Sequence, residues 1–69
     1  MMERVDARGL SCPEPVILTR KALQSGAAAY EILVDNVTSR ENVTRFAEHA
    51  GYTVSVTEKD GEYTLSLKK

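Results

Sequence analysis

The order in which strand-like and helix-like patterns follow one another limits this chain to few folds. Apolar and polar side chains alternate over residues 30–35, 52–57 and 63–67, which predicts three strands. A shorter segment, residues 3–7, places Val5 between charged residues and suits an edge strand. Helical spacing of apolar residues fills the two longer intervals between these segments. The predicted order is therefore βαβαββ.

The two expected helices have recognisable ends. The first should run from about Pro13 to Ser25 and stop at Gly26. Its apolar side is expected to comprise Val16, Leu18, Ala22 and Leu23. The second is expected to open with a capping box, Thr-Ser-Arg-Glu over residues 38–41, and to close at Gly51.

This order determines the expected architecture. Strands joined through a helix run parallel with a right-handed crossover, whereas the last two, joined by Asp60-Gly61, form an antiparallel hairpin. Most of the strands have one apolar side, so both helices should cover the apolar face of the sheet and leave its other face exposed to solvent. We expect one α/β (α+β) domain over residues 1–69: a two-layer sandwich of a four-stranded mixed sheet with two helices on one face.

The main candidate for a functional site is residues 9–15, Gly-Leu-Ser-Cys-Pro-Glu-Pro, which contain the single cysteine. Cys12 is expected at the N-cap of the first helix and Pro13 at its first position, where the missing N–H costs nothing. The helix dipole and the amides of Glu14 and Val16 would then face the sulfur. Such surroundings lower the pKa of a thiol and favour the nucleophilic thiolate.

Two charges beside Cys12 modify this expectation. Glu14 opposes thiolate formation by like charge, and Arg8 offsets that opposition. The alternative is that Cys12 is a small buried apolar residue, as many free cysteines are. The adjacent glycine and prolines favour an exposed loop instead.

Other residues are candidates for the same site. Ile17, one turn from Cys12, is either an ordinary exposed apolar residue or a docking contact beside the sulfur. Because helix N-termini in parallel crossovers meet beyond the carboxyl ends of the strands, Arg40 is either a surface charge or a group that holds an anionic sulfur or a partner. His49 lies too far along its helix to act as the base for Cys12.

The composition excludes several classes of protein. One cysteine and one histidine in 69 residues form neither a Cys-rich zinc site nor a CxxC redox pair. Nine basic residues against ten acidic ones give a net charge of −1, which does not favour direct binding to nucleic acid. Without an export signal or an apolar run of membrane-spanning length, we expect no membrane association and a cytoplasmic location.

A motif in the first part of the chain resembles the signature of the TusA/SirA-type sulfur-carrier family. The matching residues are Asp6-x-x-Gly9-x-x-Cys12-Pro13-x-Pro15. Residues 35–43 and 46–52 look most like the amino-terminal domain of the YedF-type branch, which is associated with selenium or sulfur metabolism. The resemblance covers essentially the whole chain and implies the sheet order 1-2-4-3.

The resemblance implies a carrier rather than a stand-alone enzyme. Cys12 would accept sulfur as a persulfide from a cysteine desulfurase or a rhodanese-like donor and relay it to a downstream acceptor protein. No further cofactor is implied. Asp6 and Gly9 would shape the loop, through local hydrogen bonds and backbone freedom respectively. Thiolation of tRNA, molybdenum cofactor synthesis, sulfur oxidation and selenium handling are all compatible destinations.

Two other functions stay open. The chain could be a protein-interaction or regulatory module in which the CPxP turn only starts a helix. The resembled sandwich also occurs in a translation initiation factor domain, so RNA binding is a further candidate, although the acidic balance argues against it.

Overall fold

The computed structural model describes residues 2–10 and 13–69, so that Met1, Ser11 and Cys12 lie outside the described residues. The element order βαβαββ is confirmed, with bounds close to those predicted. The elements are β1 (Met2–Asp6), α1 (Glu14–Leu23), β2 (Ala29–Val34), α2 (Val37–His49), β3 (Thr53–Lys59) and β4 (Glu62–Lys68).

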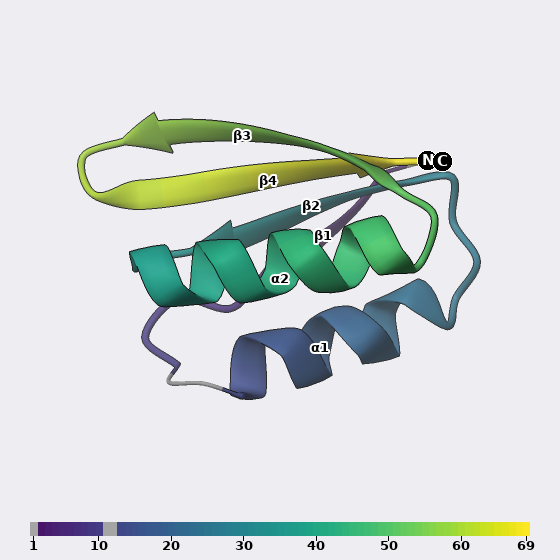
Figure 1. Cartoon of the computed structure of the whole chain (residues 1–69), viewed down its shortest axis with the longest axis horizontal. Coiled ribbons are helices and arrows are strands. Elements are labelled where there is room, and N and C mark those ends of the chain that lie inside the picture. The colour runs from purple at the N-terminus through teal and green to yellow at the C-terminus, as the bar shows by residue number, and fades with distance from the viewer. Residues whose placement is uncertain (1, 11–12) are drawn as a thin grey trace.

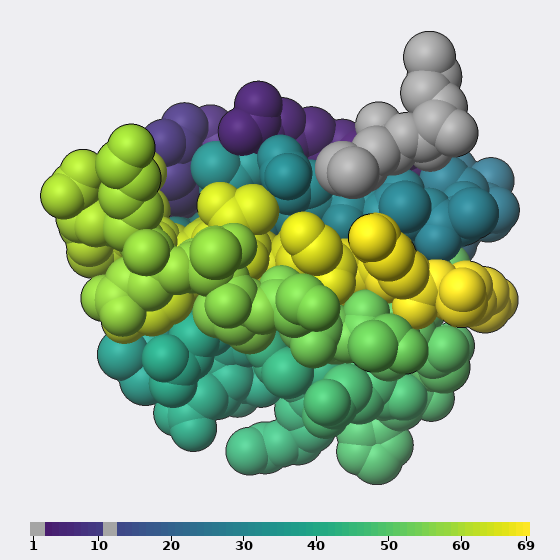
Figure 2. All heavy atoms as spheres, turned by 90° about the horizontal axis from the view of Figure 1, so that it is seen from above, coloured from purple at the N-terminus to yellow at the C-terminus, as the bar shows by residue number. Residues whose placement is uncertain are grey.

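The sheet has the expected order β1-β2-β4-β3. β1 pairs with β2 in parallel, and β4 pairs antiparallel with both β2 and β3. Figure 2 shows the four strands as successive bands, from purple β1 to the yellow-green β3 at the other edge. Asp60 and Gly61 both have positive φ, 53° and 78°, as the predicted tight hairpin turn requires.

Both helices pack on one face of this sheet (Figure 1), which confirms the two-layer sandwich. The core lies between the layers, where alternate residues of the two central strands are completely buried. These residues are Tyr30, Ile32, Val34, Leu65 and Leu67. The opposite face is mostly polar and carries the ion pair of Arg4 with Glu31 at 3.1 Å. Leu33 is the exception at 8% exposure, because it lies in a central strand between Asp6 and Thr64.

The packing face of α1 differs in part from the predicted one. The predicted Val16, Leu18, Ala22 and Leu23 are partly buried against the core. The fully buried residues are instead Pro15 and Thr19. Thr19 is accommodated because its Oγ1 donates to the carbonyl of Pro15 at 2.8 Å, which removes the cost of burying a hydroxyl.

The predicted starts of both helices were wrong by one or two positions. Pro13 is the N-cap of α1 rather than its first residue, because its carbonyl accepts the first helical bond, from Ile17 at 3.1 Å. In α2 no capping box opens at Thr38. Asn36 caps the helix instead, since its extended backbone lets the side chain accept from the Ser39 amide at 2.8 Å.

Candidate functional site

Asp6, where β1 ends, and Glu14, where α1 begins, lie at the end of the sheet where both helices start (Figure 1). Figure 1 shows the starts of α1 and α2 and the β3–β4 hairpin at this same end. The prediction that Cys12 is the N-cap of α1 was wrong, because Pro13 holds that position. Cys12 itself, the predicted sulfur-bearing residue, lies outside the described residues. The site is therefore built from the residues on either side of it.

Before the cysteine, Asp6 and Arg8 form the local hydrogen bonds expected of this motif. Asp6 Oδ1 accepts from the amide and Nε of Arg8 at 3.1 and 2.9 Å, and Oδ2 accepts from Nη2 at 2.8 Å. These bonds lower the pKa of Asp6 from 3.8 to about 2 and raise that of Arg8. Arg8 also reaches Glu62 at the start of β4, with Nη1 3.2 Å from Oε1. The positive charge of Arg8 is thus shared between two carboxylates.

Gly9 continues this anchored segment. Its φ of +77° is accessible mainly to glycine, and a Cβ there would meet no atom within 4 Å, so backbone conformation rather than space explains the residue. Its amide donates to Asp35 Oδ2 at 2.8 Å, just after β2. Asp35 Oδ1 in turn accepts from Asn36 Nδ2 at 3.2 Å. The cysteine loop is thereby connected to the cap of α2.

After the cysteine, the first turn of α1 supplies fewer amides than predicted. The amide of Val16 donates to the Pro13 carbonyl at 3.1 Å, so it is not the free amide that the sequence predicted. Glu14, the other predicted donor, occupies the first helical position, and Pro15 follows it. Glu14 and Pro13 are exposed. Ile17 is 43% exposed, as expected for a residue outside the packing face.

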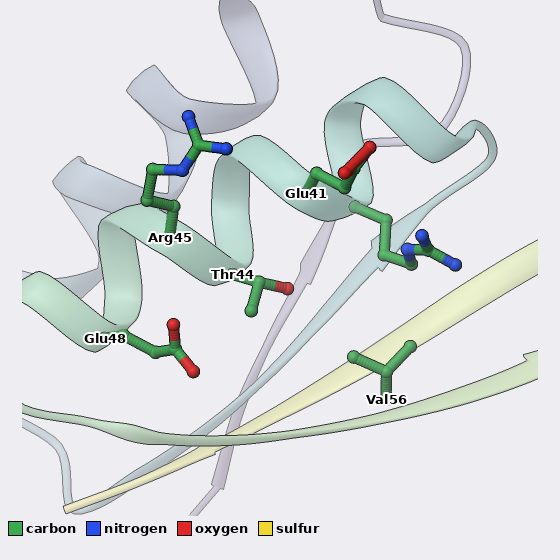
Figure 3. A pocket seen from close by; sticks show the side chains of 6 residues that line it. Glu41, Thr44, Arg45, Glu48 and Val56 are labelled. Atoms are coloured by element: carbon green, nitrogen blue, oxygen red, sulfur yellow. The ribbon is translucent and has the colours of Figure 1, made fainter.

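Arg40 lies in the first turns of α2, and its guanidinium stacks over the ring of Tyr63, with Cζ 5.1 Å from the centroid. It also lines a surface groove between α2 and β3. The groove is lined by Arg40, Glu41, Thr44, Arg45, Glu48 and Val56. Figure 3 shows Val56 projecting from β3 toward the helix. His49 ends α2 and is at the far end from the site, as predicted.

Sequence reasoning missed three residues at this end: Asp35, Glu62 and Tyr63. Each follows or begins a strand and contacts the motif or Arg40 only through the sheet register. The Asp60-Gly61 pair predicted the position of the hairpin, but nothing in the sequence indicated that Glu62, the next residue, would contact Arg8. Within the described ranges, neither helix has the length and hydrophobicity that crossing a bilayer requires.

Comparison with known proteins agrees with this geometry. Residues 3–69 match the family of Sulfurtransferase TusA. A candidate sulfur carrier protein of Methanocaldococcus jannaschii is 37% identical over 71 aligned positions, which cover 99% of this chain and 95% of that protein. The crystal structure of a SirA-like protein from Desulfitobacterium hafniense superposes with a TM-score of 0.87 at 40% identity, covering 99% of this chain and 96% of that one. The chain therefore belongs to the TusA sulfurtransferase family.

Proposed function

We propose that this protein carries sulfur as a persulfide on Cys12 and relays it to a partner protein. Its family supports a role in sulfur transfer. The observation that carries the proposal is that the single cysteine of the chain directly precedes Pro13, the N-cap of α1. The positive end of the helix dipole favours an anion there, whether thiolate or persulfide.

The proposed relay consists of two balanced exchanges. The Cys12 thiolate attacks the outer sulfur of a persulfide on the donor, so that an S–S bond forms on Cys12 and the donor leaves as a thiolate. A thiolate of the acceptor then attacks the same outer sulfur and releases Cys12. Sulfur moves without net oxidation, and no resident cofactor is needed. Because the chain has no second cysteine, no internal thiol competes for the cargo.

Residues around Cys12 receive supporting roles in this proposal. Asp6, Arg8 and Gly9 shape the loop before the sulfur, whereas Pro13 and Pro15 set the start of α1. Glu14 places a negative charge beside the sulfur and selects among partners. Ile17 and Arg40 contact the partner, through apolar area and positive charge respectively.

The proposed partners are a cysteine desulfurase or rhodanese-like donor and a thiol-bearing acceptor protein in the cytoplasm. The same relay serves tRNA thiolation, molybdenum cofactor synthesis, sulfur oxidation or selenium handling, and the donor and acceptor decide which. In none of these does the chain itself need to bind nucleic acid.

A two-step transfer assay tests the proposal. The protein is incubated with a cysteine desulfurase and sulfur-labelled cysteine, separated from the donor, and then mixed with a small thiol. We expect label on the wild type, release of that label by the thiol, and no label on Cys12→Ser. Equal labelling of Cys12→Ser would contradict the proposal. A folded Cys12→Ala that retains every partner interaction, together with a wild type that takes up no label, would favour the interaction module.

A further inference from the structure

The described residues on either side of Ser11 and Cys12 make defined contacts. Before this pair, the amide of Ala7 donates to Leu33 at 2.8 Å, the amide of Gly9 donates to Asp35 at 2.8 Å, and Leu10 packs against the core. After it, the Pro13 carbonyl accepts from two amides of α1. The chain between Leu10 and Pro13 consists of Ser11 and Cys12 alone. Leu10 and Pro13, the described residues on either side of this pair, therefore both have defined contacts.

Among these contacts, the one with Asp35 has the clearest geometry for positioning. The two carboxylate oxygens of Asp35 have different partners: Oδ2 accepts from the Gly9 amide, and Oδ1 accepts from Asn36 Nδ2 at 3.2 Å. Asn36 caps α2 by accepting from the Ser39 amide. The Asp35 side chain thus connects, through hydrogen bonds, the backbone before the cysteine to the N-cap of α2.

The conformation of Gly9 makes this hydrogen bond consequential. Gly9 has a φ of +77°, which glycine adopts more readily than other residues because it lacks a Cβ. No atom lies within 4 Å of the position that a Cβ would take, so packing does not restrict the backbone there. An external hydrogen bond restricts such a backbone more than it would restrict that of another residue. The bond to Asp35 comes from a residue 26 positions away and supplies such a contact.

We infer that Asp35 is a positioning residue for Cys12: through the Gly9 amide it fixes the described segment that leads into the cysteine. This inference rests on the proposed function for its role in sulfur transfer. Its effect on the thiol itself is measurable without any sulfur donor.

Two variants of Asp35 separate hydrogen bonding from charge. Asp35→Asn and Asp35→Ala both remove the negative charge, but only Asn keeps an oxygen that can accept from Gly9. Any difference between them reports the hydrogen bond. Glu48→Ala, which removes an exposed charge near the end of α2, controls for net charge.

The readouts are the pH profile of Cys12 alkylation by iodoacetamide and the rate of persulfide loading from a cysteine desulfurase. We expect Asp35→Ala to load about tenfold more slowly than Asp35→Asn, because misplacing a reacting atom is costly. The pKa of its thiol should also lie above that of the Asn variant. Asp35→Asn should load within about threefold of the wild type, and Glu48→Ala should match the wild type.

Identical alkylation profiles and loading rates for Asp35→Ala and Asp35→Asn would overturn the inference. If Asp35→Ala fails to fold, Asp35→Leu replaces it, and failure of both to fold would assign Asp35 to folding and overturn the inference as well. If the alkylation profiles differ as expected while no protein, including the wild type, takes up sulfur, the proposed function fails and the positioning role stands.

Discussion

The guanidinium of Arg8 donates to the carboxylate of Glu62 across 3.2 Å, although 54 positions separate the two residues. This contact joins the loop before the cysteine to the first residue of β4. Figure 2 shows the hairpin beside the end of β1, consistent with this contact. Because Arg8 also bonds Asp6, one exposed cation connects the end of the edge strand β1 to the start of the central strand β4. Exposed ion pairs of this kind weaken with salt and with acid.

The first prediction concerns acid stability. Arg8 depresses the pKa of Asp6 from 3.8 to about 2 in the folded protein. The contribution of this carboxylate is therefore fully present above pH 4 and is lost as the pH falls toward 2. Melting temperatures of the wild type and Asp6→Asn should differ at pH 6 and converge near pH 2. A constant difference over this range would contradict the lowered pKa of Asp6 in the folded protein.

The cap of α2 gives a second prediction. Asn36→Ala should lower the free energy of unfolding by about 1 kcal/mol, because the Ser39 amide loses its acceptor. Asn36→Ser should retain most of the stability. Thr38→Ala is the matched control and should stay within about 0.5 kcal/mol of the wild type. Urea denaturation measures the free energy of unfolding of all three variants. A larger loss of stability for Thr38→Ala than for Asn36→Ala would support a capping box at Thr38 and contradict the cap at Asn36.

A third prediction concerns the charge beside the sulfur. Glu14 occupies the first position of α1, two residues after Cys12. Glu14→Gln should lower the pKa of the Cys12 thiol, because it removes a like charge, and should raise the alkylation rate at pH 7 about twofold. Glu41→Gln, an exposed acid on α2, is the control and should leave that rate unchanged. A slower reaction of Glu14→Gln would count against this role.

Partner docking is tested by two equally exposed apolar residues. Ile17 and Val56 are each 43% exposed, but Ile17 lies on the first turns of α1 and Val56 on β3. Ile17→Ser should raise the KM of the donor cysteine desulfurase for this protein roughly threefold, since apolar area at the contact is lost. Val56→Ser should leave KM unchanged, with both melting temperatures near the wild type. Equal effects of the two substitutions would argue against docking at Ile17.

Local patterns were sufficient to predict the layers of this fold. Alternation in β2 and β4 identified residues that are in fact buried, such as Ile32 and Leu65. The turn at Asp60-Gly61 fixed the hairpin because both residues adopt positive φ. The order of the strands came from the family resemblance, since alternation alone does not say which strands are neighbours.

The details that sequence reasoning missed depend on contacts between distant residues. Asn36 and Thr38 are both good caps, and the conformation at the end of β2 decides between them. Thr19 looked polar, but the Pro15 carbonyl satisfies its hydroxyl inside the core. Only the sheet register brings Arg8 to Glu62, and no spacing along the chain encodes that. The placement of Cys12 itself stays a prediction.

The most direct test of the central claim is the intact mass of the wild type and Cys12→Ser after incubation with a cysteine desulfurase and cysteine. We predict that the wild type gains the mass of one sulfur atom, that reductant removes it, and that Cys12→Ser gains nothing. A wild type that gains no sulfur while its Cys12 is freely alkylated by iodoacetamide, or a Cys12→Ser that gains the same mass, would contradict the account.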